Sequence, residues 1–449
     1  KHRAPVIGDK NSLGNKLLTA LPFELTKAQQ KVIGEIKNDL ARTSPMQRLV
    51  QGDVGCGKTL VAVMAALSAV EAGMQTAVMA PTEILSEQHY NNFCSWLQPL
   101  GIHITWLTGK QKTAERRKSQ EEIATGKAQI VVGTHALFQE EVSFYNLGLF
   151  VIDEQHRFGV HQRMALREKG RDGQQYPHQL IMTATPIPRT LAMTAYADLD
   201  VSIIDELPPG RQEVETIVIP NDRRDEITAR VHHACKAGRQ VYWVCSLIEE
   251  SEALQCQAAS DTAVLLQECL QDLKIGLIHG RMKPDDKEQV MLAFKQGEID
   301  LLVATTVIEV GVDVPNASLM VIENSERFGL SQLHQLRGRV GRGSEKSSCV
   351  LMYQTPLSEN SRTRLAVMRE TSDGFKIAQH DLELRGPGEV LGTRQTGIMQ
   401  FHIADIIRDQ ALIPEVNKVA ETLLMQNPDH AKLIMRRWLG ETEQYGNVG

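Results

Sequence analysis

The amino-acid sequence predicts an α/β protein in which two doubly wound parallel sheets are followed by a mostly helical segment. Short apolar strands alternate with helical stretches in two series, separated by Leu207-Pro208-Pro209-Gly210. Such alternation is typical of parallel sheets, and a Pro-Gly cluster is typical of a junction. We therefore expect a linker at 1–22, one domain at 23–206, a second domain at 207–355 and helices at 356–449.

The composition is that of an ordinary globular protein. At 449 residues the chain has room for about two to four domains. No apolar run approaches the roughly 20 residues of a membrane span, and no signal peptide is visible. The seven cysteines form no CxxC pair, which is typical of reduced thiols in a cytosolic protein. With a formal net charge of −6, a nucleic-acid partner has to meet a local basic surface.

The first domain begins with a helix whose start is marked by Thr26 and Gln29. Thr26 suits the N-cap and Gln29 the third helical position, which together form a capping box. The Gln29 amide also offers both a donor and an acceptor, as an adenine edge requires. The sequence leaves both roles of Gln29 open.

The stretch after this helix has the pattern of a phosphate-binding P-loop. It follows the apolar pair Leu49-Val50 and leads into apolar residues at helical spacing, so a strand, a glycine loop and a helix follow one another. The glycines let backbone N–H groups close around phosphate oxygens. Lys58 can reach the β- and γ-phosphates, and the Thr59 hydroxyl can ligate Mg²⁺. The predicted loop consists of Gly52, Asp53, Val54, Gly55, Cys56, Gly57, Lys58 and Thr59, with Cys56 as a small filler.

The next strands of the first domain are expected at 76–80, 128–132, 149–152 and 179–182, each followed by polar residues. In parallel sheets the site lies beyond the carboxyl ends of the strands. The third of these strands runs into Asp153 and Glu154. Asp153 can hold Mg²⁺, and Glu154 can orient and deprotonate an attacking water. Because strand alternation points adjacent side chains apart, this pair must sit where the strand ends.

The second series contains no second P-loop, but it carries two glycine-flanked arginines, Arg339 and Arg342. A spacing of three predicts that both lie on one helix face. A guanidinium suits a γ-phosphate, and the alternative is a basic surface helix that binds DNA phosphates. If both arginines reach the nucleotide, ATP lies between two domains, and hydrolysis opens and closes a cleft. The strands of this series are expected at 215–219, 241–245, 275–278, 301–305, 319–322 and 349–353.

The ordered set of motifs resembles the superfamily-2 helicase core of two RecA-like domains, over about residues 23–400. The resemblance implies an ATP- and Mg²⁺-dependent motor, and it adds Gln335 to the catalytic residues and Asp313 to the nucleotide-binding residues. The matching motifs are Gln29, Gly52–Thr59, Pro81–Glu83, Gly133–His135, Asp153–His156, Thr183–Thr185, Thr305–Asp313 and Gln335–Arg342.

Two further stretches narrow the resemblance. Arg157–Val160 and Arg385–Gly397 resemble only the RecG family of branched-DNA translocases and the transcription-repair coupling translocases. Glu206–Arg211 and Gly392–Gly397 are similar to the RecG family. That family is bacterial and acts on stalled replication forks and Holliday junctions in recombination and DNA repair.

The RecG resemblance implies further properties of the chain. A helical hairpin and loop at 357–399 is expected to grip duplex DNA, with Arg364 and Gln395 in roles that couple ATP use to translocation. Expected partners are double-stranded and branched DNA and single-stranded DNA-binding protein. The expected state is a cytoplasmic, nucleoid-associated monomer.

One feature of the RecG family is missing from this sequence. Nothing in it resembles the N-terminal wedge domain, and the chain starts with Lys1 and a polar stretch, so we expect the motor part of a longer polypeptide. One alternative function is a duplex-tracking motor of the transcription-repair coupling type. The other is a DNA clamp switched by ATP binding, which Glu154 and the arginine pair argue against.

Overall fold

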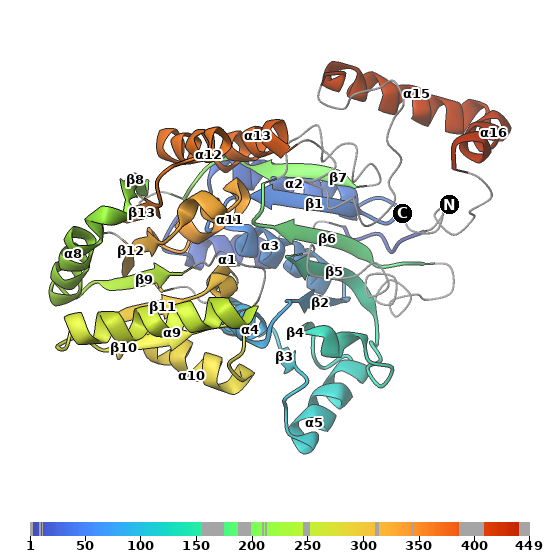
Figure 1. Cartoon of the computed structure of the whole chain (residues 1–449). Coiled ribbons are helices and arrows are strands. Elements are labelled where there is room, and N and C mark those ends of the chain that lie inside the picture. The colour runs from blue at the N-terminus through green and yellow to red at the C-terminus, as the bar shows by residue number, and fades with distance from the viewer. Residues whose placement is uncertain are drawn as a thin grey trace.

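The computed structural model describes residues 3–8, 10, 12–154, 175–186, 199–208, 211, 213–245, 252–309, 314–343, 345–385 and 408–439. Within these ranges the strands form a seven-stranded and a six-stranded sheet. Helices cover both faces of each sheet, and the two sheet domains lie side by side (Figure 1). The prediction of two doubly wound parallel sheets is confirmed.

The first sheet contains, in spatial order, β3 (Ile104–Leu107), β4 (Ile130–Gly133), β2 (Gln75–Met79), β5 (Leu147–Asp153), β6 (His178–Thr183), β1 (Gln47–Gly52) and β7 (Asp200–Ile204). All neighbouring strands are parallel. Successive residues point to opposite faces, so Val78 and Val132 join one core while Ala77 and Val131 join the other. Both faces are therefore buried.

Helices cover the two faces of the first sheet unequally. Helices α1 (Ser12–Ala20), α2 (Lys27–Leu40), α3 (Lys58–Glu71) and α4 (Glu83–Leu97) pack on one face, and α5 (Thr113–Ala124) packs on the other. Helix α3 is buried from Leu60 to Val70, because α1 and α2 lie against it. The short 3-10 helices are η1 (Gln98–Leu100) and η2 (His135–Phe138).

The sequence predicts residues 1–22 as a linker, and the structure differs for part of this stretch. Helix α1 packs on α3, and the side chains of Ile7 and Leu17 are each only 1% exposed. Leu13 and Leu18 pack against the same core. These apolar side chains gain burial in the first domain, so this part of the stretch is a covering layer instead of a free linker.

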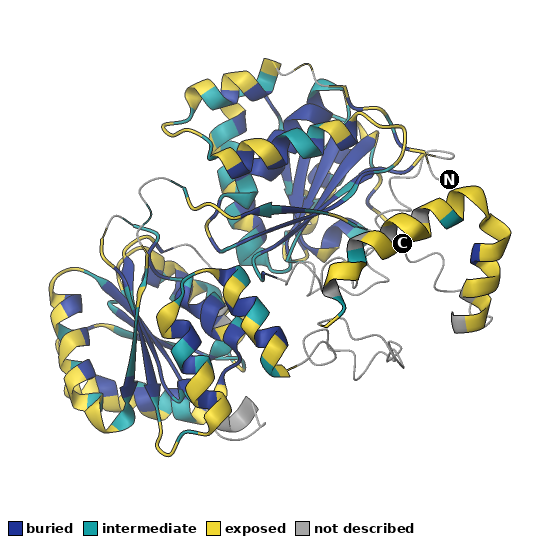
Figure 2. Ribbon diagram, turned by 90° about the horizontal axis from the view of Figure 1, so that it is seen from above, coloured by how far each residue is buried: buried dark blue, intermediate teal, exposed yellow. Residues whose placement is uncertain are grey.

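The second sheet contains, in spatial order, β10 (Ile275–Ile278), β11 (Leu301–Ala304), β9 (Gln240–Val244), β12 (Ala317–Ile322), β13 (Ser348–Tyr353) and β8 (Glu215–Pro220). Its neighbouring strands are also parallel. Tyr242 and Val244 belong to one core, and Val241 and Trp243 to the other. Figure 2 shows the strands of both sheets as buried layers between partly exposed helices.

The helices of the second domain divide between the two faces in the same way. Helices α8 (Arg224–Lys236) and α9 (Glu252–Cys269) cover one face. The other face is covered by α10 (Pro284–Lys295), α11 (Leu330–Arg337), α12 (Glu359–Glu370) and α13 (Gly374–Arg385). The short 3-10 helices are η4 (Asn221–Arg223), η5 (Thr306–Glu309) and η6 (Ser325–Arg327). Helices α12 and α13 form the expected hairpin, and the loop after it lies outside the described residues.

Every apolar run that the sequence predicts as a strand coincides with a strand of the structure. Two strands, β3 and β7, have no counterpart in the prediction. Both are at the edges of the first sheet, and β7 starts with an exposed Asp200. Strand β3 has only four residues, and only alternate residues of β7 are buried, so neither gives a long apolar run.

The chain ends in a second helical pair, η7 (Gln410–Leu412) with α15 (Ile413–Gln426) and α16 (Pro428–Leu439). Helices α15 and α16 pack on each other and lie to one side of the two sheets in Figures 1 and 2. The helical character that the sequence predicts for 356–449 is confirmed for this pair. Much of their apolar surface is exposed, with Val416 and Val419 each 60% accessible.

Candidate active site

The predicted phosphate-binding loop connects β1 to α3. Gly55 and Gly57 have φ angles of 82° and 89°, in the left-handed region that favours glycine. The Lys58 ammonium bends back and donates to the carbonyl oxygens of Gly52 (2.6 Å) and Asp53 (3.0 Å). Strand, loop and helix therefore have the arrangement in which backbone N–H groups can surround a phosphate.

The predictions for Cys56 and Gln29 can also be compared with the structure. Cys56 is 1% exposed, and burial raises the pKa of its thiol, so it stays neutral and fills space as expected. Gln29 forms the predicted capping box, since its Oε1 accepts from the Thr26 N–H at 2.9 Å. Its Nε2 donates to the Cys56 carbonyl oxygen at 2.8 Å. Gln29 therefore ties the start of α2 to the phosphate loop, and its contact with adenine stays a prediction.

The two carboxylates after the third predicted strand lie at the end of β5. Strand β5 ends with Asp153, and Glu154 has a φ angle of 54°. The Glu154 N–H donates to the Met182 carbonyl oxygen of β6 at 3.0 Å. The turn at Glu154 interrupts the alternation of side-chain directions along the strand, which would otherwise separate the two carboxylates. This agrees with the prediction that the pair lies where the strand ends.

The charge state of the pair suits a base beside a charged carboxylate. Burial, followed by the negative charge of Asp153, raises the pKa of Glu154 to about 7, while Lys58 and Arg339 act in the opposite direction. Burial also raises the pKa of Asp153, but a hydrogen bond and charge from His89, with help from Lys58, hold it below its ordinary value. Asp153 is thus the charged partner, and Glu154 is poised near neutrality, where a general base works best.

His89 is a residue of this site to which sequence reasoning assigned no role. It comes from α4, and its Nε2 lies 2.7 Å from Oδ2 of Asp153. The side chain is 6% exposed. The only signal in the sequence is its place in the helix that follows Pro81-Thr82-Glu83, and a single histidine has no diagnostic spacing.

The second domain supplies residues that face this loop from α11 and the turn after it. Helix α11 ends at Arg337, so the prediction that Arg339 and Arg342 share a helix face is wrong. Gly341 in this turn has a φ angle of 78°, in the left-handed region that favours glycine. A Cβ on Gly338 would lie 3.0 Å from the Val54 Cβ, so a glycine there lets the turn approach the phosphate loop.

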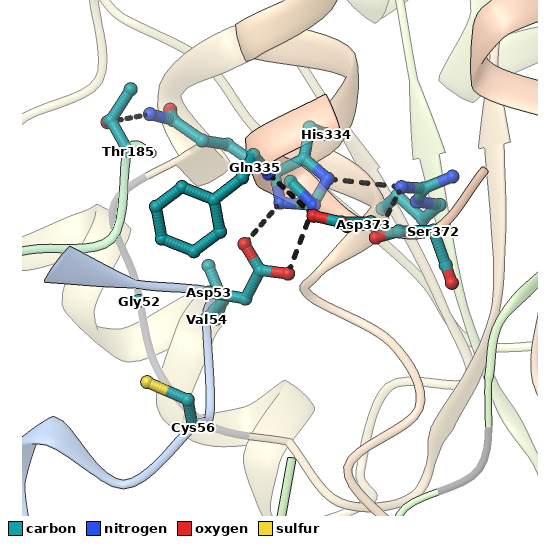
Figure 3. Close-up of polar contacts among 12 residues, drawn as sticks. Gly52, Asp53, Val54, Cys56, Thr185, His334, Gln335, Ser372 and Asp373 are labelled. Atoms are coloured by element: carbon teal, nitrogen blue, oxygen red, sulfur yellow. Dashed lines mark hydrogen bonds and ion pairs between the residues drawn. The ribbon is translucent and has the colours of Figure 1, made fainter. Parts of the chain in front are cut away.

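One contact between the two domains joins a predicted residue of the second domain to a predicted motif of the first. Gln335 donates from Nε2 to the Thr185 hydroxyl at 2.6 Å (Figure 3). The charge of Arg339 lowers the pKa of Glu154, which places Arg339 near the carboxylate pair. Arg342 donates from Nε to the Gly338 carbonyl oxygen at 3.4 Å. Residues 157–160, 392–397, Asp313 and Gln395 lie outside the described residues.

Arg364 has contacts that differ from those of a DNA-binding arginine. Its guanidinium donates to the carbonyl oxygens of Phe328 and Glu326, each at 2.7 Å, and to the Ser361 hydroxyl at 3.1 Å. Burial lowers its pKa. Arg364 therefore fastens α12 to η6, which agrees with a coupling role better than with a direct contact to DNA.

Three family descriptions match the chain. Residues 26–194 match the DEAD/DEAH box helicase family, and residues 225–344 match the helicase conserved C-terminal domain. Residues 371–437 match the C-terminal part of domain 3 of the ATP-dependent DNA helicase RecG.

Similar proteins from several bacteria are all named ATP-dependent DNA helicase RecG. The chain is 62% identical to the ATP-dependent DNA helicase RecG of Escherichia coli (strain K12), over all of this chain and 65% of that protein. It is 60% identical to the Haemophilus influenzae protein and 47% identical to the Aquifex aeolicus protein, each over 98% of this chain and over 64% and 56% of those proteins. The chain thus spans less than two thirds of these relatives.

Solved structures agree with this relationship. A structure described as RecG bound to a three-way DNA junction has a TM-score of 0.77 and 44% identity, over 91% of this chain and 53% of that one. The helicase MrfA bound to DNA and AMPPNP has a TM-score of 0.61 at 15% identity, over 90% of this chain and 62% of that one, and shows the fold alone. The whole length of this chain therefore aligns with one family, and the chain belongs to the family of the ATP-dependent DNA helicase RecG.

Proposed function

We propose that this chain is the motor of an ATP-dependent translocase that moves along duplex DNA and remodels branched DNA in recombination and repair. The observation that supports it best is the joint placement of Glu154 at the end of β5 and Arg339 on the opposite domain. A site completed by two domains changes when its nucleotide is hydrolysed, so hydrolysis can drive their relative movement.

The roles of the site residues follow from their chemistry. Lys58 leaves the carbonyl oxygens of Gly52 and Asp53 and holds the β- and γ-phosphates. Glu154 orients a water and takes its proton. Arg339 and Arg342 stabilise the charge that develops on the transferred phosphoryl group, and Gln335 links them to Thr185 of the first domain. Gln29 reads the adenine edge, and Asp313 completes the nucleotide site.

The donors in the site suit Mg²⁺. Among the residues that the structure describes, no group of three or more His, Cys, Asp or Glu side chains is placed to hold a metal ion by itself. Mg²⁺ fits this arrangement, because it usually binds one or two protein ligands together with phosphates and water. Thr59 and Asp153 would hold it, and it would neutralise charge between the β- and γ-phosphates.

The DNA substrate is inferred from the family. The relatives are named as ATP-dependent DNA helicases, and the related solved protein is bound to a three-way junction. We infer double-stranded and branched DNA as the substrate, single-stranded DNA-binding protein as a further partner, a monomer, and a cytoplasmic location at the nucleoid. None of the helices that the structure describes is long and apolar enough to cross a membrane.

Steady-state ATP hydrolysis with Mg²⁺, with and without linear duplex or a three-way junction, tests the proposal. DNA should stimulate hydrolysis, Lys58→Ala should abolish it through loss of nucleotide binding, and Glu154→Gln should bind ATP without turning it over. Hydrolysis by Glu154→Gln at a rate near that of the unmodified chain would remove Glu154 as the base. Nucleotide binding without any hydrolysis by the unmodified chain would favour the ATP-switched clamp.

A further inference from the structure

The side chain of Asp53 points away from the phosphate loop and contacts two parts of the second half of the chain (Figure 3). Its Oδ1 lies 3.0 Å from Nε2 of His334, on α11. Its Oδ2 accepts from the N–H of Gly374, the first residue of α13, at 3.3 Å. One carboxylate of the nucleotide site therefore holds both α11 and the start of the second hairpin helix.

The hydrogen on His334 is fixed by the chemistry of its neighbours. Nδ1 of His334 lies 3.1 Å from Nη2 of Arg337. A guanidinium only donates, so Nδ1 has to accept, and the hydrogen of the neutral ring is on Nε2, which donates to Asp53. His334 is 6% exposed, so water does not replace these partners readily. The ring is thus a two-ended connector between Asp53 and Arg337.

Arg337 continues this chain of contacts into the hairpin. It is 4% exposed, and its Nη1 donates to the carbonyl oxygens of Met368 (3.0 Å) and Thr371 (2.9 Å). Its Nη2 donates to the Ser372 carbonyl oxygen at 3.2 Å. These carbonyls belong to the end of α12 and the turn before α13. The guanidinium therefore fixes the hairpin turn relative to α11.

Gly374 allows the hairpin to come this close. A Cβ at this position would lie 2.1 Å from Oδ1 of Asp53, 2.6 Å from Nε2 of His334 and 2.7 Å from Cγ of Pro186. The space therefore admits only a glycine. The start of α13 is lodged against the phosphate loop, α11 and the residue that follows the Thr183–Thr185 motif.

Asp53 is held as the anion in this position. Burial alone would raise its pKa, but the hydrogen bond from His334, the Gly374 N–H and the charge of Lys58 hold the pKa below its ordinary value. A charged acceptor strengthens both hydrogen bonds that it receives. The Asp53 carboxylate is therefore a charged acceptor shared by α11 and the start of α13.

We propose that His334 is a positioning residue that transmits the nucleotide state of the phosphate loop, through Asp53 and Arg337, to the α12–α13 hairpin. The inference rests on the proposed function, since it names the path by which that site acts on the hairpin. In the structure, Lys58 donates to the Asp53 carbonyl oxygen. Phosphates that draw Lys58 away alter the backbone and the charge around Asp53, and His334 and Gly374 follow its carboxylate.

Three substitutions separate the two ends of the connector. His334→Gln keeps a donor near the Nε2 position and so retains the Asp53 contact alone. His334→Asn keeps an acceptor near the Nδ1 position and so retains the Arg337 contact alone, and His334→Ala removes both. The relay needs the hydrogen bonds of His334 to both Asp53 and Arg337, so all three variants should lose the coupling between the phosphate loop and the hairpin. His334→Gln and His334→Asn each keep one of these hydrogen bonds, which should preserve the fold. His380→Ala is the matched control, since His380 is an exposed histidine on α13 that pairs with Glu383.

The first measurement is amide hydrogen exchange of the 449-residue chain with and without Mg²⁺ and a non-hydrolysable ATP analogue. In the unmodified chain and His380→Ala, nucleotide should change exchange both in the phosphate loop and in residues 371–374. In the three His334 variants the loop should still respond, and the response of 371–374 should be lost. An unchanged response of 371–374 in His334→Ala overturns the proposal.

The second measurement compares ATP consumed with triplex displaced on linear duplex. The His334 variants should consume about tenfold more ATP per displacement, which is an ordinary size for coupling between sites. Equal coupling in His334→Gln and the unmodified chain would mean that the Asp53 contact suffices, and it would overturn the relay through Arg337. A failure of the unmodified chain to hydrolyse ATP with DNA would refute the proposed function instead, and the exchange experiment would still decide the relay.

Discussion

The backbone of Glu154 has a φ angle of 54°, in a region that a residue with a side chain rarely adopts. Such a conformation costs about 1–3 kcal/mol and persists only where the surroundings enforce it. Here the hydrogen bond from its N–H to Met182 provides part of that support. In return, two adjacent carboxylates stay close together at a strand end, and burial with mutual repulsion raises the pKa of one of them.

The arginines on the second domain are expected to act mainly on the rate of ATP hydrolysis. Arg342→Ala should lower kcat far more than it raises the Kd for ATP, because a charge applied mainly to the transition state affects rate more than ground-state binding. Arginines in this role are typically worth about 10³–10⁵ in rate. Single-turnover hydrolysis and equilibrium binding of a fluorescent ATP analogue measure the two quantities.

Arg342→Lys is the matched variant, because it keeps the charge and loses the planar fork. It should recover only part of the rate. Arg339→Ala should behave as Arg342→Ala does, since the charge of Arg339 already acts on Glu154. A loss of affinity with an unchanged rate would show that the arginines hold the ground state.

Single residues differ in how well the sequence predicts them. Lys58 and the pair Asp153-Glu154 follow from local patterns, because loop, strand and helix are consecutive in the chain. His89 and His334 do not, since each meets its carboxylate only through the tertiary fold; His334 and Asp53 are 281 positions apart. An isolated histidine on a helix has no local feature that distinguishes a site residue from a core residue.

At the scale of elements, β6 shows how a buried polar side chain joins parts of the first domain. Nδ1 of His178 accepts from the Met46 N–H at 3.0 Å, and its Nε2 donates to the Pro5 carbonyl oxygen at 2.7 Å. His178 thereby ties the N-terminal stretch and β1 to β6. Burial lowers the pKa of His178 from its ordinary 6.5.

The lowered pKa of His178 leads to a prediction of how the free energy of unfolding depends on pH. Because the folded pKa is lowered, the unfolded chain binds the proton more readily, so the His178 contribution is complete above pH 6.5 and is lost as pH falls towards the folded pKa. His178→Gln keeps a donor towards Pro5 and leaves the Met46 N–H without its acceptor, which should cost about 1–3 kcal/mol at pH 7.5.

Urea unfolding at pH 7.5 and pH 5.5 checks this prediction. The difference between the variant and the unmodified chain should shrink at pH 5.5. His103→Gln serves as the control, since His103 is 42% exposed and pairs with Glu122. An equal difference at both pH values would mean that the lowered pKa of His178 does not contribute to stability.

Elements were predicted best where they are buried on both sides. The central strands appear as continuous apolar runs, and the cap of α2 appears as Thr26 with Gln29. The end of α11 could not be predicted from arginine spacing, because the helix stops where Gly338 must approach Val54 of the other domain. That constraint is a contact between domains, and no local pattern records it.

The sequence predicts two domains but not how they meet. Besides the contacts at the site, Lys110 after β3 lies 2.7 Å from Asp285 and 3.6 Å from Glu288, both on α10 of the second domain. It also lies 3.1 Å from Glu83 of its own domain. One exposed cation thus bridges carboxylates of both domains at a distance from the nucleotide loop.

This bridge leads to a prediction about domain arrangement. Exposed ion pairs contribute little to stability, so Lys110→Ala should leave the thermal midpoint unchanged. It should nevertheless raise the ratio of open to closed molecules by about twofold to fivefold, because even a weak interaction shifts a balanced equilibrium. A pair of fluorophores, one on each domain, measures that ratio by energy transfer.

The matched control is Lys127→Ala, because Lys127 pairs with Glu122 inside the first domain. Raising the salt concentration should open the unmodified chain and the control, and it should have little further effect on Lys110→Ala, since screening removes the same interaction. An energy-transfer ratio that is equal in all three proteins at low salt would mean that Lys110 does not help to hold the domains together.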